Sequence, residues 1–199
     1  MQFNNDNTNN RILIGTFVSA DVKNASRDFT RNFKKEARNF KFVNLEQLHV
    51  SHQFLGDSVS PESIEIIIAS LNAGKGVLQQ LDITIDSIAF GFPSQKNPTQ
   101  IFWTIDNTPE LNEFTRKVHL IIQKNEFWDV KKFKDRGKLT QHITIARTKR
   151  DISSSYAKKI RPTLSAKLPM KMTIDHIAVI KSVLSAEGPK YWELARFEF

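Results

Sequence analysis

The stretch Leu48-His-Val-Ser-His-Gln-Phe-Leu-Gly-Asp57 carries the strongest structural signal in this sequence. Its apolar and β-branched residues predict a strand over 48–55, and the Gly-Asp pair that follows predicts a turn. Successive side chains of a strand point to opposite faces, so His49 shares a face with Ser51 and His52 points the other way. The segment therefore presents one imidazole and one hydroxyl side by side.

The segment Gln141-His-Ile-Thr-Ile-Ala146 repeats this arrangement later in the chain. His142 and Thr144 again stand two residues apart on a predicted strand, so both motifs have the order histidine, apolar residue, hydroxyl residue. Residues 49 and 142 are 93 positions apart in a chain of 199 residues, as expected for a duplicated lobe. Histidines with pKa values near neutrality act as acids and bases, so the pair predicts a catalytic site.

Strands and helices alternate through the rest of the chain. Ser60, followed by a proline, is expected to cap one helix, and Thr108 another. No stretch has the composition of a long linker, so we expect one compact α+β unit. Strands are predicted at 11–18, 48–55, 81–90, 100–106, 141–146, 172–182 and 191–199, and helices at 20–38, 60–74, 108–125 and 152–163, with a turn at 92–98.

Composition narrows the functional classes. The chain has no cysteine, which excludes disulfides, thiolate metal sites and a cysteine nucleophile. Its formal charge of +8 favours an anionic partner such as nucleic acid. Residues 1–10 lack a basic or apolar segment, so we expect a disordered tail rather than a signal peptide. No apolar run approaches the roughly 18 residues that span a bilayer, and a cytoplasmic location is expected.

The two motifs resemble the paired H-x-[ST]-x signatures of the two-histidine (2H) phosphoesterases. The chain is most similar to the LigT-like (ThpR) RNA 2′,3′-cyclic phosphodiesterases of bacteria and archaea, from about residue 11 to residue 199. The resemblance implies two pseudo-symmetric lobes, each an antiparallel sheet backed by helices, around a central active-site cleft. Residues 11–199 are then a single bilobal domain, expected to be a monomer.

The resemblance also implies the reaction: hydrolysis of an RNA 2′,3′-cyclic phosphate to a 2′-phosphomonoester, with no metal and no nucleotide cofactor. By this analogy His49 is the proton donor and His142 the proton acceptor that activates water. The two roles exchange if the reaction runs backwards as 2′–5′ ligation. The hydroxyls of Ser51 and Thr144 are suited to donate hydrogen bonds to the phosphoryl oxygens. Ser51 stands where the family more often has threonine.

Phe54 and Arg147 each follow a motif histidine by five residues. By resemblance they flank the substrate, with Arg147 toward the phosphate and Phe54 toward a base or ribose. On a flat strand both have the wrong parity for the face that carries the histidines. We therefore expect a β-bulge or a strand end between each of them and its motif histidine.

A basic run at 131–138 precedes the second motif. It interleaves an aromatic residue with the candidate RNA-phosphate contacts Lys131, Lys132, Lys134 and Lys138. A solvated loop without a ligand is the alternative interpretation.

The remaining histidines are interpreted as structural. His52 should lie on the face that carries Val50 and Phe54, away from the cleft. A metal site made by His49, His52 and His142 would require neighbouring positions of opposite parity to point the same way, so no metal ligand is assigned. His119 and His176 match neither motif.

Two other functions fit the same features. One is a phosphodiesterase for another cyclic or 2′,5′-linked nucleotide. The other is a non-catalytic module that binds RNA ends, although binding alone would not need both an acid and a base.

Overall fold

Two antiparallel sheets form the centre of the computed structural model, which describes residues 10–33, 39–93, 98–123, 141–149, 152–153, 155–156, 168–185 and 188–199. The four-stranded sheet has the order β3 (His49–Gly56), β1 (Arg11–Phe17), β8 (His176–Ser185), β9 (Gly188–Glu198). The five-stranded sheet has the order β2 (Phe40–Phe42), β6 (His142–Thr148), β5 (Pro98–Ile105), β4 (Leu81–Pro93), β7 (Met170–Ile174). The prediction of an α+β fold with two antiparallel sheets and helices is confirmed.

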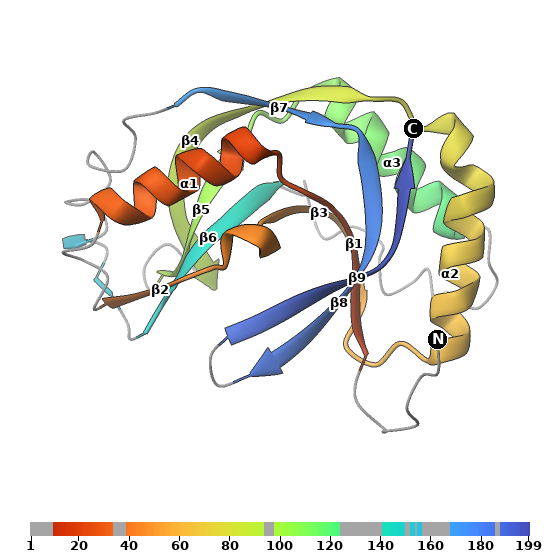
Figure 1. The fold of residues 1–199 in the computed structure, drawn as a ribbon, viewed down its shortest axis with the longest axis horizontal. Helices are drawn as coiled ribbons and strands as arrows, with labels where there is room; N and C mark the ends of the chain where they lie inside the picture. Colours follow the sequence, from red (N-terminus) through yellow and green to blue (C-terminus); the bar gives the residue numbers. More distant parts are fainter. Residues whose placement is uncertain are drawn as a thin grey trace.

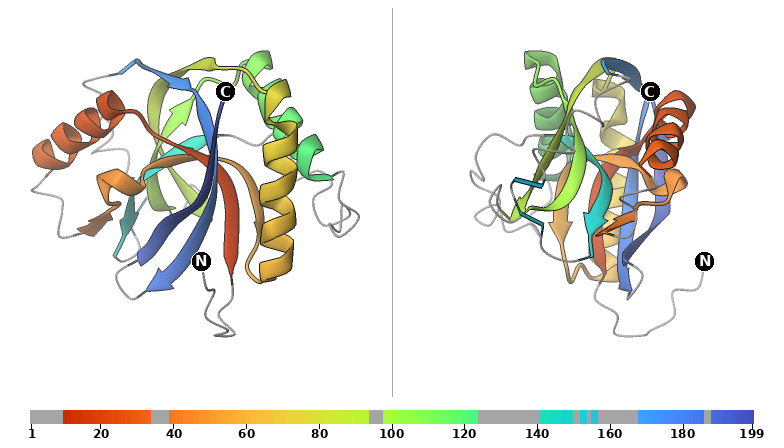
Figure 2. Two further views of the ribbon diagram at one scale, coloured as in Figure 1. Left: turned by 45° about the vertical axis from the view of Figure 1, so that its right-hand side comes forward. Right: turned by 90° about the vertical axis from the view of Figure 1, so that its left-hand side faces the viewer.

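The helices cover the two sheets from opposite sides of the molecule (Figure 1). Helix α1 (Ala20–Asn32) follows β1 but packs on the five-stranded sheet, where the rings of Phe29 and Trp103 lie 6.3 Å apart. Helices α2 (Pro61–Gly74) and α3 (Pro109–Gln123) pack together, α2 against β9 and α3 against β3 and β4. The turned views of Figure 2 show the same separation of α1 from the pair α2 and α3.

Helix starts follow the capping chemistry expected from the sequence. The Ser60 hydroxyl accepts a hydrogen bond from the Ser63 amide at 3.1 Å, and the Thr108 hydroxyl accepts one from the Leu111 amide at 3.2 Å. The short 3-10 helices η2 (Leu45–Gln47) and η3 (Lys75–Val77) were not predicted.

The predicted strand at 172–182 is wrong as one element. It divides at Asp175, where the chain leaves one sheet and enters the other. The first part, β7, pairs with β4, and the second part, β8, pairs with β1 and β9. A nearly continuous apolar sequence hides this change of sheet, because buried residues stand on both sides of Asp175.

Several predicted boundaries fall outside the described residues. Residues 1–9 of the predicted tail, most of the helix at 152–163 and residues 94–97 of the turn belong to this group. Asn10 does not belong to a disordered tail, since its amide nitrogen Nδ2 donates to the Val59 carbonyl at 3.1 Å. Among the helices of the described residues, none has the length and apolar content that crossing a membrane requires.

The interior consists of two apolar clusters on opposite faces of the four-stranded sheet. The large one fills the space between the sheets and the helices. The small one, made by Leu13, Ala178 and Ile180, lies on the other face and is covered only in part by Phe17, Phe54 and Tyr191. This second face is the one that carries the motif histidine His49, because His49 contacts the rings of Phe17 and Tyr191.

Candidate active site

His49 is the first residue of β3, and its ring is held from three sides. Nδ1 lies 2.8 Å from the carbonyl oxygen of Gln47, and because a carbonyl only accepts, Nδ1 carries the hydrogen. The ring meets Tyr191 edge-on at 4.5 Å and Phe17 at 6.2 Å between centroids. This arrangement leaves Nε2 as the ring nitrogen that can face a ligand.

A β-bulge in β3 sets the faces of the residues after His49. Ser51 pairs with Gly15 and Gln53 pairs with Ile14, so His52 is an extra residue without a partner of its own in β1. His52 is fully buried, whereas His49, Ser51 and Phe54 are partly exposed. The bulge therefore turns Phe54 onto the histidine face. The prediction that His52 and Phe54 share a face is wrong for this reason.

Strand β6 contains the same irregularity at the same distance from its histidine. Thr144 pairs with Phe102 and Ala146 pairs with Ile101, which leaves Ile145 as the extra residue. The burial of β6 then follows that of β3: Ile143 and Ile145 are buried and His142, Thr144 and Arg147 are partly exposed. On each strand, one face thus carries the histidine, the hydroxyl residue and the residue that follows the histidine by five positions. This is the irregularity that the sequence required.

Gly15 makes the close approach of β1 and β3 beside this site possible. A Cβ atom added there would lie 2.6 Å from the carbonyl oxygen of Val50, the residue after His49. Real Cβ atoms do not approach a backbone oxygen that closely, so a side chain at this position would push the motif strand away. The glycine is part of what positions His49.

Positive groups of the other sheet act on His49. Burial lowers its pKa, the hydrogen bond to the Gln47 carbonyl raises it in part, and the charges of His142 and Arg147 lower it further. Strands β3 and β6 lie in contact, which brings the two motifs together from the two sheets. The motif histidines are thus electrostatically coupled across the site.

The donors of the second motif lie beside a residue that the sequence alone did not indicate. Thr144 Oγ1 donates to the side-chain oxygen of Gln100 on β5 at 3.2 Å. Gln100 also pairs with Arg147 across the sheet, so the amide lies next to both candidate phosphate ligands. Arg147 Nε is buried and has no hydrogen-bond partner among the described residues. A buried unpaired guanidinium donor is costly and is satisfied by an anion.

The remaining candidates have different surroundings. The guanidinium of Arg11 stacks over the Phe54 ring at 4.5 Å, so one face of that ring is already covered. The ring of Phe102 lies 4.9 Å from that of His142. Lys131, Lys132, Lys134 and Lys138 lie outside the described residues.

His52 belongs to a buried hydrogen-bond chain rather than to the site. Thr16 Oγ1 donates to the carbonyl of His176 at 2.6 Å and therefore accepts from His52 Nε2 at 2.8 Å. The ring also contacts Phe114 at 5.2 Å. Burial lowers the pKa of His52 to about 3, with the charges of His176 and His49 acting in the same direction.

His119 and His176 also make structural contacts. His119 on α3 is hydrogen-bonded to the side chains of Gln53 and Gln123, and Gln53 lies at the β3 bulge. His176 Nδ1 lies 2.5 Å from Asp175 Oδ1, where β7 gives way to β8. Within the part of the chain that the structure describes, no three His, Cys, Asp or Glu side chains are grouped to hold a metal ion.

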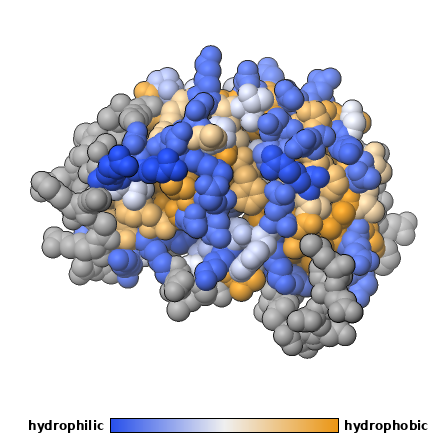
Figure 3. Space-filling model, viewed as in Figure 1, coloured by the Kyte–Doolittle hydropathy of each residue, from blue (hydrophilic) through white to orange (hydrophobic). Residues whose placement is uncertain are grey.

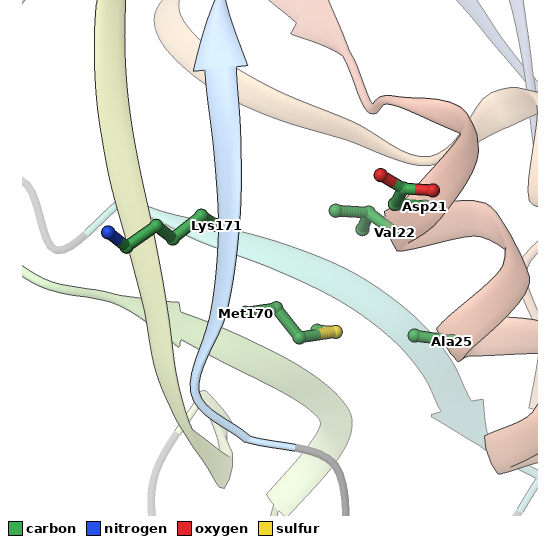
Figure 4. A pocket seen from close by; sticks show the side chains of 5 residues that line it. All are labelled: Asp21, Val22, Ala25, Met170 and Lys171. Atoms are coloured by element: carbon green, nitrogen blue, oxygen red, sulfur yellow. The ribbon is translucent and has the colours of Figure 1, made fainter.

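A groove of about 220 Å³ lies beside the site, where strands of the two sheets meet, and neither motif histidine lines it. Gln47 and Arg147 form part of its wall, and residues of β2 and of the β8–β9 hairpin form the rest. A larger hollow of about 550 Å³ lies elsewhere, between α1 and β7 (Figure 4). Its lining of Asp21, Val22, Ala25, Met170 and Lys171 includes none of the candidate site residues.

Known proteins resemble the chain over nearly its whole length. No model of a known protein family matches it. An RNA 2′,3′-cyclic phosphodiesterase of Thermotoga maritima is 24% identical over 190 residues, which cover 95% of this chain and 95% of that protein. This match spans both histidine motifs, and the two motifs occupy equivalent bulged strands. The chain is similar to the LigT-like two-histidine phosphoesterases.

Solved structures show the same fold. The protein TT0787 of Thermus thermophilus superposes with a TM-score of 0.71 at 18% identity, covering 94% of this chain and 97% of that one. Escherichia coli LigT superposes with a TM-score of 0.66 at 15% identity, covering 96% and 98%. LigT has also been solved in complexes with phosphate and with 3′-AMP. The similarity of these LigT-like structures is one of fold.

Proposed function

We propose that this LigT-like phosphoesterase hydrolyses RNA ends that carry a 2′,3′-cyclic phosphate and leaves a 2′-phosphomonoester. The main support is the matched pair of bulged strands, each presenting a histidine and a hydroxyl residue toward one site. The similarity to the Thermotoga maritima RNA 2′,3′-cyclic phosphodiesterase supports the same reaction.

His142 acts as the base and His49 as the acid in this reaction. His142 removes a proton from water, whose oxygen attacks phosphorus and forms the new P–O bond. The bond from phosphorus to the 3′ oxygen breaks, and His49 Nε2 supplies the proton that this oxygen needs. The Nδ1 bond to Gln47 supports this role, because it fixes the ring and leaves Nε2 toward the ligand.

The bound phosphate itself prepares His49 for the acid role. In the free site, burial and the neighbouring positive groups lower the pKa of His49 and favour its neutral form. A substrate phosphate brings negative charge and opposes the effect of His142 and Arg147. Binding therefore promotes protonation of His49, and the acid is charged when its substrate is present.

Three side chains stabilise the phosphoryl oxygens. Arg147 donates from the buried Nε, which has no partner in the described residues. Thr144 turns its hydroxyl from Gln100 to the phosphate, and Ser51 donates from the opposite strand. The partly exposed rings of Phe54 and Tyr191 provide apolar surface for the ribose or the base. In 2′–5′ ligation the 5′ hydroxyl of a second RNA takes the place of water, so both histidines keep these roles, and they exchange them when the 2′–5′ bond is cleaved back to the cyclic phosphate.

A product assay tests this proposal. The protein is incubated with a 2′,3′-cyclic mononucleotide in EDTA, and 2′- and 3′-phosphates are separated. Formation of the 2′-phosphate alone is the expected result. Formation of the 3′-phosphate would contradict the assigned leaving group, and loss of activity in EDTA would contradict a metal-free mechanism. Binding without turnover would favour the non-catalytic RNA-end module.

A further inference from the structure

A row of polar side chains extends from the site across three strands of the five-stranded sheet. Lys41 on β2 pairs with Arg147 on β6, and Arg147 pairs with Gln100 on β5. Directly opposed residues of antiparallel strands project from the same face. Phe40 and Phe42, on either side of Lys41, pack with Phe33 of the α1 region. Lys41 therefore projects from the face that carries the second histidine motif.

This row places two cations directly opposite each other. An RNA strand can contact both side chains, because it carries a row of phosphates. Arg147 lies on the same strand as His142, and Lys41 lies on the next strand, β2, whose backbone is about 4.8 Å away from that of β6. The two cations therefore fit two neighbouring anionic groups rather than one.

The other sheet supplies a third cation to the same groove. Lys190 on β9 lines it together with Lys41 and Arg147. The β8–β9 hairpin reaches β2 here, and a Cβ atom on Gly188 would lie 3.7 Å from the Lys41 side chain. Figure 1 shows the end of this hairpin below and to the right of β2, and hydrophilic side chains lie over part of the same lower region in Figure 3.

We propose that Lys41 and Lys190 form a second phosphate subsite, which binds the phosphodiester on the 5′ side of the terminal nucleotide. The inference rests on the proposed function: Arg147 holds the reacting cyclic phosphate, and the chain upstream of it leaves along the groove. The side-chain amides of Asn44 and Gln47 line the same wall and suit the ribose hydroxyls. The subsite makes the enzyme selective for an RNA end over a cyclic mononucleotide.

Three substrates separate this subsite from the reaction centre. They are 2′,3′-cyclic AMP, the dinucleotide ApA ending in a 2′,3′-cyclic phosphate, and the same dinucleotide with an uncharged methylphosphonate as its internal linkage. Steady-state kcat and KM are measured for the wild type, Lys41→Met, Lys190→Met and the control Lys171→Met. Lys171 is exposed on β7 and is not among the residues that line the groove; it borders the separate hollow shown in Figure 4.

Each subsite variant should raise the KM of the charged dinucleotide about tenfold, as expected for one charge-assisted contact. The kcat for the charged dinucleotide should not change. For the cyclic mononucleotide and the methylphosphonate dinucleotide, both kcat and KM should match those of the wild type and of Lys171→Met. The dependence of log KM on log salt should also become shallower by about 0.7 for each lysine, the value for one phosphate contact on a single strand.

Other results would overturn the subsite. Equal increases in KM for all three substrates would place the lysines on the reacting phosphate. Unchanged KM for the charged dinucleotide would mean that the upstream chain leaves by another route. A lower melting temperature together with lower kcat on every substrate would make Lys41 and Lys190 structural links between the sheets. Failure of the wild type to hydrolyse any substrate would instead contradict the proposed function.

Discussion

At the scale of single residues, the two motif histidines differ in their surroundings. His49 is fixed through Nδ1 by a backbone carbonyl and enclosed by Phe17 and Tyr191, while His142 lies against Phe102. A hydrogen bond that fixes the tautomer prepares a histidine for directional proton transfer. This asymmetry is consistent with different roles for two residues that have nearly the same sequence context.

Removing either imidazole should abolish most of the activity. We expect His49→Ala and His142→Ala each to lower kcat by about 10²- to 10⁴-fold, the usual contribution of a general acid or base. Both residues are partly exposed, so circular dichroism and the melting temperature should stay close to the wild type. Near-normal turnover by either variant would exclude the two-histidine mechanism.

The pKa of His49 should respond to the charge of Arg147. Because that charge lowers the pKa, Arg147→Gln should raise it, and burial should still keep it below 6.5. An NMR titration of the His49 ring in the free enzyme measures this directly. With His49 as the acid, the alkaline fall of kcat/KM should move to higher pH in the same variant. A shift to lower pH would contradict the proximity of the two groups.

His52 should affect stability and leave catalysis intact. Its folded pKa of about 3 lies below the ordinary 6.5, so the unfolded chain binds an extra proton between these values. Stability is complete above pH 6.5 and falls by up to about 1.4 kcal/mol for each pH unit below it.

Denaturant melts of His52→Leu between pH 7 and pH 4 test this link. The loss of stability on acidification should be smaller than in the wild type, and turnover at neutral pH should stay within a few-fold. Thr16 keeps its bond to the His176 carbonyl, so the substitution leaves no buried hydroxyl donor unpaired. A fall in turnover as large as that of His49→Ala would place His52 in the site.

At the scale of elements, strand parity predicted the site only up to a point. It paired His49 with Ser51 and His142 with Thr144, and it required an irregularity before Phe54 and Arg147 could reach the same face. The sequence did not say where the irregularity would fall. The bulge in β3 lies opposite Gly15 of another strand, where a side chain would clash with the Val50 carbonyl.

Other features depended on contacts that a linear pattern does not contain. Strand β2 has only three residues, too few for an alternation to be recognised, yet it supplies Lys41. Gln100 became part of the site through the register of β5 with β6. The division of β7 from β8 at Asp175 follows from a change of pairing partner inside one apolar run.

Gly15→Ala tests the element that aligns the first motif. The added methyl group would lie 2.6 Å from the Val50 carbonyl, so β1 and β3 must separate or the strand must distort. We expect a loss of about 1–3 kcal/mol of stability, typical of overpacking, and a clear fall in kcat because His49 moves.

A matched control is Gly76→Ala, since a Cβ atom there has no heavy atom within 4 Å. This control should leave kcat unchanged. Urea melts and kinetics on a cyclic mononucleotide compare the two variants. Equal behaviour of both would show that the close approach at Gly15 does not position the motif.

At the scale of the whole molecule, the active site depends on both sheets being held in one arrangement. The chain passes directly from β7 in one sheet to β8 in the other, α1 packs on the sheet that does not contain β1, and α3 packs against strands of both. Such exchanged connections predict that the two halves do not fold separately.

A destabilising change in one sheet should therefore unfold both. Ile174 is fully buried at the end of β7, and Ile174→Ala should cost about 2–5 kcal/mol. The ring signals of His49 and His142, which report on the two sheets, can be followed by NMR through a urea titration. Both should disappear at one midpoint in the wild type and at one lower midpoint in the variant. If His142 lost its native signal at a lower urea concentration than His49, the lobes would be separable units, and the site would form by docking of two independently stable halves.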